Sequence, residues 1–229
     1  MAASDYFRGR KPVEIWVPEV WAIVWLTLRV TGAALLLAAL FGVPLGAWLG
    51  LAHFRGKRLT AALVYTAMGL PPVVVGLLVY LLLSRSGPLP FLDWLFTPQA
   101  MILAQTVIAL PLVVGITTAA VEAVPPDLLL QLQSLGASPW QARRAVLREA
   151  RPGVLVALAA AFGRIISEVG AALMVGGNIE GHTRVLTTAI VLETSQGAFA
   201  LALALGGWLL ALTLAVNLVV LRLQGRPVP

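Results

Sequence analysis

The chain contains no cysteine among its 229 residues. Disulfide bonds, zinc–thiolate sites and iron–sulfur clusters are therefore excluded. Histidine is scarce as well, since only His53 and His182 are present and they lie far apart in the sequence. No HExxH motif, serine–histidine pairing or carboxylate cluster is found. The sequence thus predicts neither an enzyme nor a metal or cofactor held by this chain.

Charge is also in short supply. Charged residues make up 11% of the chain and hydrophobic residues 59%, whereas soluble domains carry about 25% charged residues. So little charge cannot cover the surface of a soluble protein of this size, which predicts an integral membrane protein. The net charge of +6 fits basic residues that collect in cytoplasmic loops, so we expect a lipid surrounding and no nucleic-acid partner.

Long apolar runs are abundant. A helix needs about 20 mostly apolar residues to cross a bilayer, and five stretches qualify. The expected spans are residues 26–52, 59–83, 100–121, 152–175 and 199–221. They predict an all-α polytopic membrane protein with five transmembrane helices, one membrane domain over residues 26–222 and a cytoplasmic tail over residues 223–229. In the first span, Gly42, Gly46 and Gly50 have the spacing that lets helix backbones approach closely.

Residues 1–25 are expected to lie outside the membrane domain, because the apolar, tryptophan-rich part from residue 13 to 25 is too short to span and suits the membrane interface. Five spans place the loops at 53–58 and 122–151 and the tail on one side. These regions hold more Lys and Arg than the opposite side, which predicts an outside N-terminus and a cytoplasmic C-terminus.

Two features inside the expected spans are candidates for a translocation pathway. Pro71 and Pro72 interrupt the second span, and such a break persists only where protein or a water-filled cavity satisfies the backbone; pathway lining and a simple kink both remain open. Arg164 and Glu168 lie four residues apart, so we expect them on one helix face. Arg164 would lie about 18 Å into the fourth span. The pair would face the interior, as part of a pathway or as a structural ion pair.

Polar residues between the fourth and fifth spans form another candidate group. They are Asn178, Thr183, Thr187 and Thr188. They could line an entrance on the outer side, or they could cap helices in that loop.

The loop 122–151 has the pattern of a helical hairpin. Asp127 is expected to cap a short apolar helix that ends near residue 135, and Gly136 interrupts it. Ser138 is expected to cap a basic helix over residues 140–150, with Pro139 in its first turn. Such a hairpin at the cytoplasmic surface fits docking into a groove on a partner, although the pattern alone also suits an interfacial loop.

The hairpin resembles the coupling loop of type I ABC importer permeases in two stretches, Leu135-Gly136-Ala137-Ser138-Pro139-Trp140 and Arg151-Pro152-Gly153. The resemblance implies that Gly136 matches the glycine beside the cytoplasmic helix that docks on the ATP-binding subunit. The implied docking residues are Leu135, Gly136, Ala137, Ser138 and Arg143. The usual Glu-Ala-Ala before the glycine is replaced here by Leu130-Gln131-Leu132, so the glycine register is implied but a docking glutamate is not.

Further stretches are similar to the oxyanion group of these permeases, which carries tungstate, molybdate and sulfate. They are residues 163–170, 175–179 and 181–184, and the stretches 68–76 and 184–190 resemble the tungstate members most. The resemblance implies a tungstate permease in a prokaryotic cytoplasmic (inner) membrane. A molybdate or sulfate permease and an ATP-independent transporter remain alternatives.

The same resemblance implies the partners. We expect a second copy of this chain, two copies of an ABC ATP-binding subunit that bind ATP and Mg, and an extracytoplasmic tungstate-binding protein.

Overall fold

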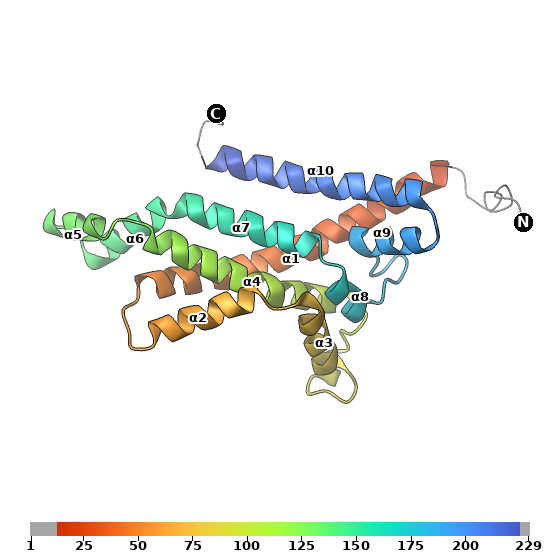
Figure 1. The fold of residues 1–229 in the computed structure, drawn as a ribbon, viewed down its shortest axis with the longest axis horizontal. Coiled ribbons are helices and arrows are strands. Elements are labelled where there is room, and N and C mark those ends of the chain that lie inside the picture. Colours follow the sequence, from red (N-terminus) through yellow and green to blue (C-terminus); the bar gives the residue numbers. More distant parts are fainter. Residues whose placement is uncertain (1–12, 225–229) are drawn as a thin grey trace, which may run out of the picture.

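The computed structural model describes residues 13–224, and over that range the chain is helical without a strand. Its elements in chain order are α1 Val13–Leu51, α2 Lys57–Met68, α3 Pro72–Leu83, the short 3-10 helix η2 Pro90–Leu92, α4 Pro98–Glu122, α5 Pro126–Ser134, α6 Pro139–Glu149, α7 Arg151–Ile166, α8 Gly170–Gly176, α9 Leu186–Ser195 and α10 Phe199–Leu223 (Figure 1). The predicted all-α class is confirmed.

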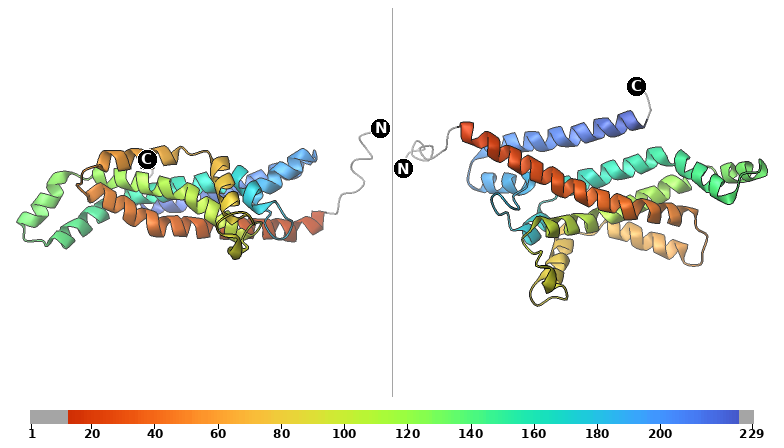
Figure 2. Two further views of the ribbon diagram at one scale, coloured as in Figure 1. Left: turned by 90° about the horizontal axis from the view of Figure 1, so that it is seen from below. Right: turned by 180° about the vertical axis from the view of Figure 1, so that it is seen from behind.

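Helix α4 forms the centre of the molecule. It packs against α1, α2, α3, α7 and α8, while α10 lies along α7 and α9 (Figure 1). Figure 2 shows from behind that α1 crosses the whole molecule diagonally. The main core lies where α1, α4, α7 and α8 meet, around Val30, Met101 and Ile165, which are all buried. The hairpin of α5 and α6 extends beyond this core at one end of the molecule (Figures 1 and 2).

The close helix contact predicted from the glycines of the first span is present between α1 and α4. A Cβ atom at Gly46 would lie 2.6 Å from the backbone oxygen of Val114. Gly42 and Gly50 face Val113 and Val121 at similarly short distances. Any side chain at these three positions would force the two helices apart.

Three of the five predicted spans are single helices: the later part of α1 over Glu19–Leu51, α4, and α10. The other two are broken; the interruption at Pro71 and Pro72 was predicted, whereas the break in the fourth span was not. The axes of α2 and α3 are bent by 94°, and those of α7 and α8 by 61°. Pro72 begins α3, because a proline lacks the N–H donor that a helix interior needs but is tolerated at a helix start. Counting each bent pair as one span gives five.

The first helix begins earlier than predicted. Residues 13–25 belong to α1 rather than to a separate interfacial segment. Tertiary packing accounts for this extension, because Val24 is buried in a cluster with Leu186 of α9 and Leu205 of α10, and the Trp21 ring lies 5.2 Å from that of Trp208. Residues 1–12 lie outside the described range, and the extracytoplasmic position of residues 1–25 stays a prediction.

Candidate functional site

The hairpin of α5 and α6 has the predicted form. Ser138 is the N-cap of α6, where its hydroxyl accepts the Gln141 N–H and its own N–H donates to Gln141 Oε1 at 2.8 Å. This reciprocal capping box fixes the start of the helix locally. Gly136 has φ +88°, a left-handed conformation that glycine adopts without strain. One detail differs: the N-cap of α5 is Pro125, and Asp127 lies in the first turn.

One face of the hairpin is anchored and the other is free. Ala142 and Val146 of α6 are buried, Val146 in a small cluster with Val121 at the end of α4. The opposite face is open, since Leu135 is 84% exposed and Trp140 is 70% exposed. Arg143 is exposed on the same helix as Trp140. Two large apolar side chains beside a cation on a protruding hairpin are typical of a protein–protein contact.

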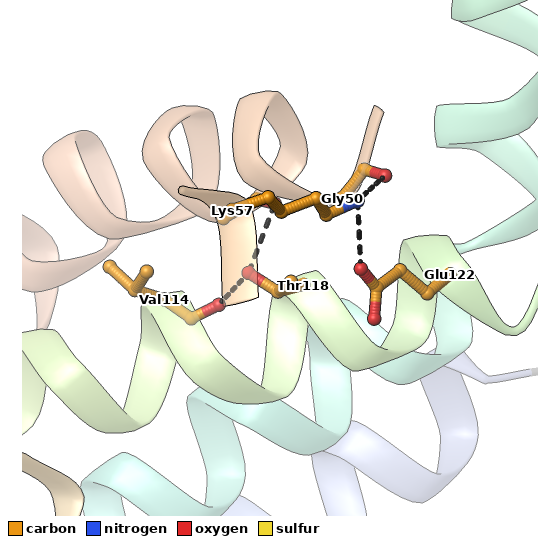
Figure 3. Close-up of polar contacts among 6 residues, drawn as sticks. Gly50, Lys57, Val114, Thr118 and Glu122 are labelled. Carbon is orange, nitrogen blue, oxygen red and sulfur yellow. Dashed lines mark hydrogen bonds and ion pairs between the residues drawn. The ribbon is translucent and has the colours of Figure 1, made fainter. Parts of the chain in front are cut away.

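A polar cluster fastens the helix ends next to this hairpin (Figure 3). Lys57, at the start of α2, forms an ion pair with Glu122 at 2.9 Å and donates to the Gly50 carbonyl at 3.1 Å. The Thr118 hydroxyl of α4 donates to the Gly46 carbonyl of α1 at 3.2 Å. These bonds join the ends of α1, α2 and α4 immediately before the chain enters the hairpin.

The two helix breaks lie side by side. A Cβ atom at Gly76 of α3 would lie 2.7 Å from the Ala171 Cα of α8, and one at Gly170 would lie 2.6 Å from Val73 Cγ2. The first turns of α3 and α8, each directly after a break, are therefore in close contact. Pro71 is exposed and Pro72 is partly buried at this place. We call residues 69–71 and 167–169, with the contact between α3 and α8, the paired breaks.

The prediction that Arg164 and Glu168 share a helix face and form an ion pair is wrong, while their role in a pathway stays a prediction. Helix α7 ends at Ile166, so the two residues do not share a helix face. Glu168 is buried, and its carboxylate accepts the Ala171 N–H at the start of α8 at 3.0 Å. Arg164 is exposed, and its side chain forms no ion pair or hydrogen bond with the side chains that the structure describes. The two side chains form no ion pair, and the Glu168 carboxylate instead holds the start of α8.

The polar residues after α8 are mostly internal. Thr183 accepts the Ile179 N–H and donates to the Gly176 carbonyl, and Thr188 accepts the Val185 N–H at the start of α9. Thr187 donates to the Glu168 carbonyl at 2.9 Å, so the structure brings these two candidates together. All three threonines are buried and act as caps and braces in this structure. Their role in a pathway stays a prediction, as does that of Asn178, which has φ +53° and a buried, unpartnered Oδ1.

One polar group was missed by the sequence reasoning. Arg184 lies within 3.8 Å of Glu19 on α1 and within 3.5 Å of Glu180. These residues border a cavity of about 350 Å³ together with Trp25 and Leu26. The spacing of Glu180 and Arg184 was a usable local signal, but the contact with Glu19 depends on the extension of α1.

Comparisons with known proteins agree with this geometry. Residues 42–227 match the family described as "Binding-protein-dependent transport system inner membrane component". A probable anion ABC transporter permease protein of Haloferax volcanii is 46% identical over 90% of both chains. A tungstate uptake system permease protein of Peptoclostridium acidaminophilum is 41% identical over 90% of this chain and 91% of its own. Among solved structures, a bacterial ABC transporter involved in import of the polysaccharide alginate has a chain with TM-score 0.73 and 21% identity, over 98% of this chain and 87% of that one, which shows a shared fold.

Proposed function

We propose that the cargo of this chain is tungstate. The premise is that the chain belongs to the family of binding-protein-dependent transport system inner membrane components and is an ABC importer permease. One observation carries the choice of cargo: the 41% identity to a tungstate uptake permease extends over nine-tenths of both chains. Molybdate and sulfate, which have the same tetrahedral shape and charge, are the alternative cargoes.

The docking point for an ATP-binding subunit is the free face of the α5–α6 hairpin. Leu135 and Trp140 are large, apolar and exposed where α5 ends and α6 begins, and a groove on a partner would bury both. Arg143 would add charge complementarity at the rim of that contact. Two such permeases would engage two ATP-binding subunits, which would hold the ATP and Mg.

Movement of the docked hairpin has a direct route into the membrane domain. Only Ala150 separates the end of α6 from the start of α7. The Lys57–Glu122 cluster joins the start of the hairpin to α1, α2 and α4. A pull on the hairpin would therefore tilt α7 and α4 together, which is the kind of rigid-body change that alternating access requires.

The arrangement of the loops supports an orientation. Residues 52–56, the hairpin and the C-terminal end of α10 lie in the half of the molecule opposite α8 and α9 (Figure 1). With the hairpin on the cytoplasmic side, the N-terminus is outside and the C-terminus is in the cytoplasm. An extracytoplasmic binding protein would then deliver the anion at the end that holds α8, α9 and the Arg184 cluster.

Labelled tungstate uptake tests this function. Liposomes would contain two copies of this chain with its cognate ATP-binding subunit, loaded binding protein outside, and ATP inside or absent. We expect uptake only with ATP, and unlabelled tungstate should compete better than molybdate or sulfate. Preference for molybdate or sulfate would change the cargo alone. Equal uptake without ATP would replace the importer with an ATP-independent transporter.

A further inference from the structure

An exposed, unpaired arginine lies at the middle of the membrane domain. Gly153 near the start of α7 packs on Ala120 near the end of α4, and Gly176 at the end of α8 packs on Met101 near the start of α4. The stretch from α7 to α8 therefore runs antiparallel to α4. At about 1.5 Å per residue, Arg164 lies roughly 16 Å from Gly153, level with about Ala109 and close to the midpoint of α4.

This position excludes lipid as the environment of the arginine. A guanidinium at the centre of a bilayer is tolerated where it faces water, protein or a counter-charge. Among the side chains that the structure describes, no carboxylate pairs with Arg164. The nearest acidic residue in sequence, Glu168, is buried and holds the Ala171 N–H.

The backbone of residues 69–71 is independent evidence that this part of the membrane domain does not face lipid. Met68, the last residue of α2, lies against Gly115, which is about 10 Å along α4 from Glu122. The exposed, non-helical residues 69–71 are therefore at membrane depth. Non-helical backbone at that depth must be covered by protein or must line water. Through Val73 and Gly170, this break touches the break that follows α7.

We infer that Arg164 contacts the oxyanion in transit, in a water-filled passage that runs beside the paired breaks. This inference rests on the proposed function and names the residue that attracts the cargo at mid-membrane. A guanidinium offers several N–H donors to a tetrahedral oxyanion.

The natural absence of cysteine makes a sharp experiment available. Arg164→Cys introduces a single thiol, which reacts with methanethiosulfonates as the thiolate in water. The variant is assembled with cysteine-free ATP-binding subunit and binding protein. It is treated with a positively charged reagent or with a negatively charged reagent of similar size, and ATP-driven uptake is measured. Arg85→Cys, in an exposed loop, is the matched control.

We expect Arg164→Cys to lose at least about tenfold in uptake, which corresponds to ~1.4 kcal/mol. The positive reagent should restore part of that uptake and the negative reagent should not, while tungstate should slow the labelling. Arg85→Cys should react with both reagents and transport normally. Arg164→Lys, which keeps the charge, should retain more uptake than Arg164→Gln, with co-purification of the ATP-binding subunit as the assembly check.

Three results would overturn the inference: no reaction of the assembled Arg164→Cys protein in water, equal restoration by both reagents, or wild-type uptake by Arg164→Gln. Failure of the proposed tungstate function can be distinguished from failure of this inference, because it would be seen in uptake by the wild-type protein. If wild-type protein carries molybdate or sulfate instead of tungstate, the labelling experiment is run with that anion. If it carries no oxyanion, both proposals fall.

Discussion

The α5–α6 hairpin and the paired breaks are both irregular points in a helical protein, and they are held in opposite ways. The hairpin takes its shape from neighbours in sequence: the Ser138–Gln141 box and the left-handed Gly136. The paired breaks take theirs from distant segments, through Gly76 on Ala171 and Thr187 on the Glu168 carbonyl. The hairpin is therefore shaped locally and keeps one exposed face. The paired breaks, in contrast, depend on contacts between segments that are far apart in the sequence.

The comparison predicts that damage to the hairpin impairs function while the fold survives. Gly136→Trp should reduce ATP-dependent uptake at least about tenfold, a loss of ~1.4 kcal/mol or more in productive docking. No atom lies within 4 Å of a Cβ at Gly136, so the side chain has room to begin, and the backbone strain of its positive φ is matched in the control variant. The measurements are uptake and co-purification of the ATP-binding subunit.

Gly197→Trp is the matched control, because Gly197 also has a positive φ, +73°, and no atom within 4 Å of a Cβ. It carries the same backbone strain but lies between α9 and α10, away from the hairpin, and should retain the ATP-binding subunit. Normal coupling in Gly136→Trp would contradict the docking role.

Damage to the paired breaks should instead reduce stability. Gly76→Ala places a methyl 2.7 Å from the Ala171 Cα, and overpacking of this kind costs about 1–3 kcal/mol. Gly206→Ala in α10 has open space and should be neutral or stabilising, because alanine favours a helix by up to ~1 kcal/mol. Denaturation midpoints in detergent compare the two variants. Equal midpoints would mean that α3 and α8 are not tightly packed.

Variants of Thr183 can distinguish a structural role of this threonine from a role in the translocation pathway. Thr183→Val removes the acceptor of the Ile179 N–H and the donor to the Gly176 carbonyl, which should cost about 1–3 kcal/mol of folding free energy. Thr183→Ser keeps the hydroxyl and should stay close to wild type. If the threonine only braces the loop, uptake per folded molecule is unchanged in Thr183→Val. A loss of uptake per folded molecule would assign it to the pathway.

The smallest expected effect is at the Lys57–Glu122 ion pair, which joins the start of α2 to the end of α4 next to the hairpin. Its side chains are 24% and 43% exposed, so water screens the pair and its coupling energy should be about 1 kcal/mol or less. A double-mutant cycle with Lys57→Gln and Glu122→Gln measures it. The control cycle pairs Lys57→Gln with Asp93→Asn before the start of α4, and should be additive.

The parts of the site that the sequence predicted are those with local causes. Ser138, Pro139 and Gly136 define the hairpin within a few residues, and each has one dominant backbone preference. Spans such as α4 follow from composition, because only a long apolar helix satisfies its backbone in lipid. The N-cap at Asp127 was wrong because Pro125 and Pro126 begin the helix earlier.

The failed predictions involve contacts across the fold. Arg164 and Glu168 have helical spacing, but α7 stops at Ile166, and the buried Glu168 is bonded to the start of α8. No local pattern in residues 152–175 showed that break, since it is stabilised by Thr187 from another segment. The early start of α1 was missed for a related reason: its packing partners Leu186 and Leu205 come from the far end of the chain.

The sequence by itself determined that this protein is an integral membrane protein, that it crosses the membrane about five times, and that it has a capped hairpin between its third and fourth spans. Those properties arise from composition and from interactions a few residues apart. Tertiary structure alone decided that the fourth span breaks after Ile166, that Arg164 and Glu168 do not pair, and which threonines are buried. Inside lipid a broken helix is affordable only where a neighbouring segment satisfies the freed backbone, and that neighbour is defined by the fold.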